Sequence, residues 1–325
     1  MSATPASPCT LQYRRSSHST INPGSLQSAI NLQQSAIRDL LPRPPLWVDT
    51  ALRASPSDVR RIGPVDVVAS SSLALLSTSI AGARTMSAEA LRNHVADAYT
   101  AVGAALTAIE RQPIRFWNFV PSPADSMGDG LDRYMVFNSG RYRGYMEWLG
   151  GAERFGRTLP TASAVGVLGD DLAIACLAST TRGIPVENPR QTPAWQYSHR
   201  YGPQPPCFSR ATIAAVNGRQ LLLVGGTASI VGETSRHDGD VDAQVAETLR
   251  NLEALVGAAT GDDGRGLAPL DRFRDLRVYV ARDQDAARIR RMVVDRCARA
   301  DRIELAIARV CRPELLVEIE GVAEI

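Results

Sequence analysis

The chain has 325 residues, which is long for one average domain and comfortable for two of ordinary size. Hydrophobic residues make up 44% and charged residues 22%, so the composition excludes a disordered chain, because enough apolar surface is available for a core. The formal net charge of +2, from 36 basic and 34 acidic residues, excludes a strong overall attraction to nucleic acid. No apolar stretch approaches the length of a membrane-spanning helix.

Cysteine and histidine are too scattered to indicate a disulfide scaffold or a metal site. The five cysteines form no CxxC pair, and no histidine lies beside them at zinc-ligand spacing. The N-terminus has no basic segment followed by an apolar run, so we expect no secretory signal. We therefore expect a cytoplasmic protein that needs no cofactor or metal and contacts neither nucleic acid nor membrane.

The first half begins with a polar segment and continues into regular elements. Residues 1–60 are rich in Ser, Pro, Gln and Arg, which predicts a loosely packed lead-in with order beginning near Val65. Residues 65–70 and 72–82 are short, apolar and closed by Gly in the second case, which is typical of strands. Ser87 then predicts the N-cap of a long amphipathic helix.

More strands are expected after that helix. The segment IRFWNFVP predicts a strand that ends at Pro121. Residues 161–180 indicate two strands joined at a Gly-Asp-Asp turn, as in a hairpin. Residues 182–206 are rich in proline and predict an extended connection.

The pattern restarts after the connection. An Asn-Gly pair beginning at Asn217 joins two apolar runs, which is the strongest short hairpin signal. Residues 240–259 have the spacing of an amphipathic helix, followed by a strand over 276–282 and a second helix over 283–298. Residues 303–325 supply two final strands, interpreted as a last hairpin.

The two halves share an order of elements. In each, a strand closes on a Gly-containing segment (STSIAG, then GGTASIVG), and a long helix and another strand follow. We therefore predict an α+β fold of two related units, each a mixed sheet with its helices on one face. The first unit is expected over 61–181 and the second, carrying the active site, over 207–325.

The last strand carries two acidic residues in an apolar setting. Strict alternation in L-L-V-E-I-E-G places Glu318 and Glu320 on one face, opposite Val317 and Ile319. A buried Glu is costly without a task or a partner. From the residues alone, two solvated side chains on an edge strand remain the alternative.

Longer strings resemble known families. LLLVGGTASI, DVDAQVAETLRNLEALV and VEIEGVA resemble the Rid (YjgF-like) superfamily. RFWNFVP, GLDRYMVFNSGR, RYGPQPPCFSRA, GGTASIVGE and CRPELLVEIEG are similar, in order, to the chorismatase family over about residues 60–325. The resemblance implies a doubled Rid-like fold and cofactor-free cleavage of chorismate, a dicarboxylate with an enol ether, in secondary metabolism.

The resemblance also assigns catalytic residues. Glu318 matches the family's catalytic acid, which protonates the enol ether to release pyruvate; burial would keep such a carboxyl group protonated. Cys311, together with Gly226 in the GGTAS segment, resembles the members that form 3-hydroxybenzoate. From the residues alone, Cys311 is also explained as a small buried hydrophobe.

Carboxylates are usually bound by arginine, whose guanidinium group donates two parallel hydrogen bonds to the two oxygens. Arg141 and Arg210 are the candidates, both expected at strand ends, with Arg143 and Arg200 as second choices. Tyr201 is expected to offer its hydroxyl to the substrate, unless it is only a packed aromatic residue.

Three other functions remain open. Chorismate could be hydrolysed to a dihydroxycyclohexadiene carboxylate instead. The chain could also be a Rid-type imine deaminase, or a non-catalytic module that binds a small carboxylate. A doubled chain encloses contacts that single units make between subunits, which favours a monomer.

Overall fold

The structure, a computed structural model, describes residues 40–261 and 266–325. Most of the expected lead-in lies outside these residues. Order nevertheless begins earlier than Val65, because helix α2 (Leu46–Leu52) and strand β1 (Asp58–Ile62) both precede it. Within the described ranges, no helix combines the length and the apolar character needed to cross a membrane.

The first sheet has six strands in the order β1-β2-β3-β8-β4-β7. All pairs are antiparallel except β4 with β7. Helix α3 follows β3, and α4 follows the small β5–β6 ribbon. The bounds are β2 (Val65–Ala69), β3 (Leu73–Ile80), α3 (Ala88–Ala108), β4 (Gln112–Pro121), β5 (Ser126–Gly128), β6 (Leu131–Asp132), α4 (Arg133–Leu149), α5 (Phe155–Thr158), β7 (Thr161–Val167) and β8 (Leu172–Ser179).

The second sheet repeats this order as β9-β10-β11-β16-β14-β15, again with one parallel pair, β14 with β15. Helix α6 takes the place of α3 and α7 that of α4. The bounds are β9 (Ile184–Val186), β10 (Ala211–Val216), β11 (Arg219–Ala228), β12 (Ile230–Val231), β13 (Thr234–Ser235), α6 (Val241–Thr260), β14 (Phe273–Val280), α7 (Ala286–Arg296), β15 (Arg302–Ile307) and β16 (Val317–Glu324).

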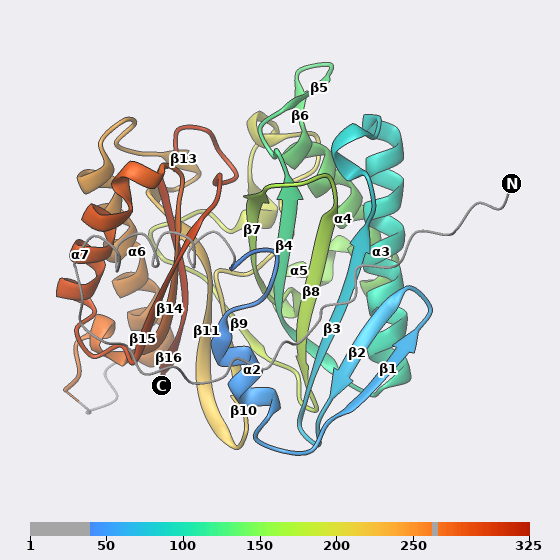
Figure 1. Ribbon diagram of the computed structural model, residues 1–325, viewed down its shortest axis with the longest axis horizontal. Helices are drawn as coiled ribbons and strands as arrows, with labels where there is room; N and C mark the ends of the chain where they lie inside the picture. Colours follow the sequence, from blue (N-terminus) through green and yellow to red (C-terminus); the bar gives the residue numbers. More distant parts are fainter. Residues whose placement is uncertain (1–39, 262–265) are drawn as a thin grey trace, which may run out of the picture. The chain divides into compact units, whose positions relative to one another are not determined.

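The expected doubled α+β fold is therefore confirmed. Each sheet bears its two long helices on its outer face, and Figure 1 shows α3 and α4 on one side and α6 and α7 on the other. The inner faces of the two sheets share a third core, to which Trp117 of β4, Tyr279 of β14 and Val322 of β16 contribute. Trp47 of α2 joins that core, with its ring 6.2 Å from the ring of Trp117.

Two predictions from short sequence segments, a helix cap and a hairpin turn, are confirmed. The Ser87 side chain accepts a hydrogen bond from the Ala90 N–H and caps α3. Asn217 and Gly218 both have positive φ, +49° and +79°, as the turn between β10 and β11 requires.

Two strand pairings differ from the expectation. Strands β7 and β8 do not form a hairpin, because β4 lies between them in the sheet. For the same reason β15 and β16 are separated by β14. The Pro-rich connection is also more ordered than expected, since β9 joins the second sheet through β10 and short 3-10 turns follow at Ala194–Gln196 and His199–Tyr201.

Candidate functional site

A cavity of about 230 Å³ lies where the two halves meet. Both halves line it, although the active site was assigned to the second unit, with Arg141 as a substrate-binding residue from the first. It brings together all six residues predicted from the sequence, which are Arg141, Tyr201, Arg210, Gly226, Cys311 and Glu318. It is also lined by Asp132, Tyr134, Met135, Ser163, Tyr197, Arg200, Phe208, Arg312 and Glu314.

Glu318 reaches the cavity because of the alternation along β16. Val317 and Ile319 face the core under α6 and α7, so Glu318 points to the opposite face, toward the first sheet. The side chain is buried, with 4% of the residue exposed. Desolvation and the nearby Glu320 carboxylate raise the pKa of Glu318 to about 8. The carboxyl group is therefore protonated at neutral pH.

Gly226 lies in an irregular part of β11, against the side chain of Glu318 on β16. The pairing of β11 with β16 shifts register between Val224 and Thr227, as in a β-bulge. The bulge takes Gly226 out of the regular ladder and leaves its α-carbon against the Glu318 side chain. This position has no room for a side chain while the carboxyl group keeps its place.

Arg141 and Arg210 are buried arginines with free hydrogen-bond donors. Arg141 donates from Nη2 to Asn138 Oδ1 at 2.8 Å, while its Nε and Nη1 have no hydrogen-bond partner among the described residues. Arg210 donates from Nη2 to Thr192 O and to the Tyr197 hydroxyl, and its Nε has none there either. Buried charges without partners are costly, so both guanidinium groups are suited to bind an anion.

The elements that carry these two arginines differ. Arg210 directly precedes β10, as expected for a strand end. Arg141 is not at a strand end, because residues 133–149 form helix α4, capped by Asp132 through the Met135 N–H. The helix brings Arg141 to the cavity from the first half.

Phe208 contacts both guanidinium groups. The Cζ atom of Arg141 is 5.7 Å from the centre of the Phe208 ring, and the Cζ atom of Arg210 is 5.3 Å from it. Cation–π contact with the ring stabilises both arginines. The sequence interpretation missed Phe208, although it precedes Arg210 by two residues within the quoted string CFSRA.

Arg312 also lines the cavity, and the sequence interpretation missed it. Its guanidinium lies 3.9 Å above the ring of Tyr201, and its Nη1 donates to Glu233 O and Ser235 Oγ. Tyr201 in turn packs against Tyr197. The signal was present in the string CRPELLVEIEG, in which Arg312 directly follows Cys311.

The Cys311 thiol lines the cavity beside Glu318. Desolvation, with a smaller contribution from the Glu318 carboxylate, raises the pKa of the thiol to about 12. The thiol is therefore neutral at physiological pH and is a weak donor rather than a nucleophilic thiolate.

The two second-choice arginines, Arg200 and Arg143, lie in different places. Arg200 lines the cavity. Arg143 points away from it and binds Glu147 and Asn93 at the surface, both at 3.1 Å.

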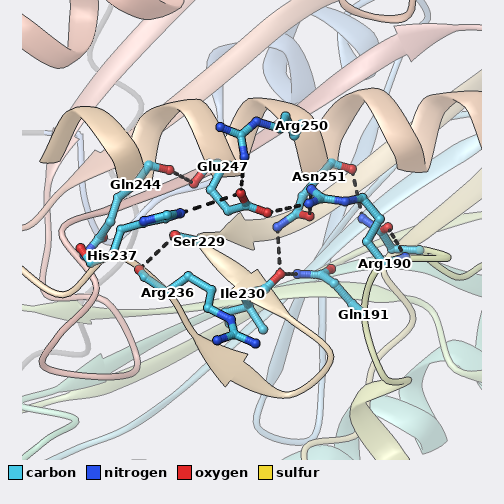
Figure 2. Close-up of polar contacts among 12 residues, drawn as sticks. Arg190, Gln191, Ser229, Ile230, Arg236, His237, Gln244, Glu247, Arg250 and Asn251 are labelled. Carbon is cyan, nitrogen blue, oxygen red and sulfur yellow. Dashed lines mark hydrogen bonds and ion pairs between the residues drawn. The ribbon is translucent and has the colours of Figure 1, made fainter. Parts of the chain in front are cut away.

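A network of hydrogen bonds from helix α6 fixes segments that line the cavity (Figure 2). Asn251 of α6 donates to the carbonyl groups of Ala228 and Ile230, both of which line the cavity. Gln244 lies about two turns earlier on α6. Its side chain donates to Glu314 O and accepts from Leu316 N. One helix therefore fixes both the end of β11 and the segment that leads from Cys311 into β16.

Arg190 links this network to the Pro-rich connection. It donates to Asn251 Oδ1 and pairs with the buried Glu247 at 2.6 Å, and Glu247 also pairs with Arg250 (Figure 2). The Glu247 carboxylate is thus paired with two arginines of this cluster. In residues 40–261 and 266–325, no three His, Cys, Asp or Glu side chains gather as metal ligands would.

Comparison with known proteins shows a similarity to chorismatases. A family model described as "Chorismatase FkbO/Hyg5-like, N-terminal" matches residues 53–178, which is the first sheet with its helices. A crystal structure of a chorismatase superposes with a TM-score of 0.72 and 28% sequence identity, and covers 82% of this chain and 80% of that one. The chain is similar to a chorismatase in both units, because the superposition extends beyond the matched N-terminal segment.

Curated relatives show the same similarity. A protein named 3-hydroxybenzoate synthase, from Streptomyces hygroscopicus, is 35% identical over 218 residues, covering 64% of this chain and 62% of the relative. A chorismatase from Streptomyces rapamycinicus is 36% identical over 214 residues, covering 64% and 63%. The match thus spans somewhat less than two thirds of the length of these relatives.

Proposed function

We propose that this protein cleaves chorismate to pyruvate and 3-hydroxybenzoate without a cofactor. One observation carries the proposal: a protonated carboxyl group, Glu318, and two buried guanidinium groups with free donors, Arg141 and Arg210, line one cavity. Chorismate needs this combination, because it has two carboxylates and an enol ether that is broken by protonation. The names of the curated relatives agree with the proposal.

The arginines bind the substrate in this proposal. Each guanidinium group takes one carboxylate in a charge-assisted contact, and the ring of Phe208 contacts both groups. Tyr201, which contacts Arg312 and also lines the cavity, offers its hydroxyl to the substrate. Binding of the dicarboxylate would satisfy the donors that lack partners among the described residues.

Glu318 supplies the proton. It protonates the terminal carbon of the enol ether, which becomes the methyl group of pyruvate, and positive charge develops at the ether carbon. The carboxylate that results is stabilised by the nearby positive charges of Arg115 and Arg210. Because its pKa is raised to about 8, Glu318 keeps its proton at neutral pH and can act as a general acid.

Product choice depends on what replaces the departing pyruvate. Chorismate has the same atoms as pyruvate plus 3-hydroxybenzoate, so this route consumes no water. The neighbouring ring hydroxyl oxygen bonds to the ring carbon that carries the ether, and the bond from that carbon to the ether oxygen breaks, so that pyruvate leaves with this oxygen. The hydroxyl oxygen's original C–O bond then opens, and the carbon that gained the oxygen loses its proton to make the ring aromatic. The route to a dihydroxycyclohexadiene carboxylate consumes one water. A neutral thiol at Cys311, beside the acid, favours the first route in this proposal.

We also propose that the enzyme is cytoplasmic and monomeric and serves secondary metabolism. The proposed units span 61–181 and 207–325, with 182–206 as the connection. The strands of the two sheets span 58–179 and 184–324, so β1 and β9 extend the sheets past these limits.

The decisive experiment is product analysis. The protein is incubated with chorismate, pyruvate is followed by coupling to lactate dehydrogenase, and the ring product is identified by chromatography. We expect pyruvate and 3-hydroxybenzoate in equal amounts, and a rate about 10²–10⁴-fold lower for the Glu318→Gln variant. Pyruvate with the diene would overturn the product assignment alone. Chorismate binding without pyruvate would indicate a binding module, and ammonia release from an imine substrate would indicate a deaminase.

A further inference from the structure

Glu320 is a second buried carboxylate beside the proposed acid. It lies two residues after Glu318 on β16, points to the same face and is 1% exposed. Its Oε2 accepts a hydrogen bond from Arg115 Nη2 at 2.6 Å, and its Oε1 accepts one from Trp117 Nε1 at 2.8 Å. The Ser163 hydroxyl also donates to Oε2. Three donors therefore surround the Glu320 carboxylate.

All three donors come from the first sheet. Arg115 and Trp117 lie on β4 and Ser163 on β7, whereas Glu320 lies on β16 of the second sheet. Ser163 also lines the cavity, and Arg115 Nη2 donates to its hydroxyl at 2.7 Å. The contact thus ties the strand of the acid to the opposite wall of the cavity.

Several charged or titratable groups face Glu318 from the elements packed around it. They are Glu320 on its own strand, Tyr279 on β14, Cys311 on the preceding segment, Arg210 before β10, Tyr134 on α4 and Arg115 on β4. Two of these groups are cations and favour loss of the Glu318 proton. A fixed anion at Glu320 opposes that loss, because two negative charges would then be close together in a buried site.

We propose that Glu320 is a positioning residue for the acid: it fastens β16 to the first sheet so that Glu318 faces the cavity, and its fixed negative charge keeps Glu318 protonated. This inference rests on the proposed role of Glu318. The raised pKa of Glu318, due first to desolvation and next to Glu320, agrees with it.

The test compares Glu320→Gln with Glu304→Gln across a pH series. Glu304 is a matched control, because it is also a buried carboxylate paired with a buried arginine, Arg277 at 2.7 Å, but lies on β15 and does not line the cavity. Without the anion, Glu318 should lose its proton at lower pH. The Glu320→Gln rate should approach that of wild type near pH 6 and fall about tenfold below it near pH 9, as a one-unit shift in pKa predicts.

A purely structural role would instead reduce the rate equally at all pH values, and this would overturn the inference; we expect no change in the pH profile for Glu304→Gln. Glu320→Asp retains the charge and should retain the pH profile while kcat falls. If Glu320→Gln does not fold, a shifted profile in Glu320→Asp overturns the proposal, and an unshifted one supports it.

A second readout needs no substrate. The infrared band of the protonated Glu318 carboxyl, assigned by its absence in Glu318→Gln, should disappear at lower pH in Glu320→Gln than in wild type. An unmoved band overturns the inference even if chorismate is cleaved. Undiminished cleavage by Glu318→Gln, in contrast, overturns the proposed acid itself.

Discussion

Gly226 and Glu318 are in direct contact across β11 and β16. A Cβ atom at position 226 would lie 2.7 Å from the carboxyl carbon of Glu318 and closer still to Oε1. The Glu318 carboxyl group occupies the space that a side chain at position 226 would need, so the size of residue 226 determines where this carboxyl group lies.

The first prediction follows from this contact. Gly226→Ala should move the Glu318 carboxyl group, because the end of a flexible side chain gives way more easily than backbone. We expect kcat to fall about tenfold or more, since a displaced general acid loses its alignment with the enol ether. Gly257→Ala on α6 is the control, because a Cβ there meets no atom within 4 Å. A wild-type kcat for Gly226→Ala would show that the carboxyl group has space elsewhere.

The second prediction concerns stability against pH. Folding raises the pKa of Glu318 from its ordinary value of 4.5 to about 8, so the folded state binds the proton more tightly than the unfolded state. This stabilisation is fully present below about pH 4.5 and is lost as pH rises through about 8. Glu318→Gln, which cannot ionise, should therefore have a higher Tm than wild type near pH 9, by several degrees. Thermal melts at several pH values would measure this, and equal melting temperatures at alkaline pH would contradict the burial of an ionisable acid.

The third prediction compares neighbouring arginines. Arg141→Ala or Arg210→Ala should weaken chorismate binding by about 2–5 kcal/mol, because a desolvated carboxylate loses its partner. Arg210→Lys should restore only part of the affinity, since an ammonium group cannot form the two-pronged contact. Arg143→Ala is the control from the same helix, because its side chain binds Glu147 and Asn93 at the surface. Titration calorimetry with chorismate on the Glu318→Gln background would measure binding without turnover, and equal affinities for the three alanine variants would exclude this binding mode.

The fourth prediction concerns the product. Cys311→Ala removes a neutral thiol beside the acid and leaves Glu318 in place. Pyruvate release should continue, while part of the ring product shifts to the dihydroxycyclohexadiene carboxylate, since about 1.4 kcal/mol changes the ratio of two routes tenfold. Chromatography of the ring products would measure the ratio. Unchanged 3-hydroxybenzoate from Cys311→Ala would show that the thiol does not influence the choice.

The sequence was sufficient for features that depend on a few neighbouring residues. The alternation V-E-I-E placed both glutamates on the face opposite Val317 and Ile319, because successive side chains of a strand point to opposite sides. The Asn-Gly turn after β10 was predictable because its two residues tolerate the positive φ that the turn requires. The repeated order of elements also predicted the doubled unit, as both sheets now show.

Helix α4 escaped the sequence analysis for a tertiary reason. It contains Gly140 and Gly144, which weaken a helical pattern. A Cβ at 140 would lie 2.5 Å from Arg92 O, and one at 144 would lie 2.6 Å from Tyr99 Cβ, both on α3. The glycines therefore allow two helices to pack closely, and the same packing brings Arg141 into the cavity.

Strand order and charge pairing were likewise decided only in three dimensions. Strands β7 and β8 are consecutive in sequence, but hydrophobic packing under α3 and α4 inserts β4 between them. Local alternation shows that Glu320 shares a face with Glu318, but it says nothing of what lies opposite. Arg115 meets Glu320 from 205 positions away, and only the packing of the two sheets makes one glutamate an ion-paired anchor and leaves the other as a protonated acid.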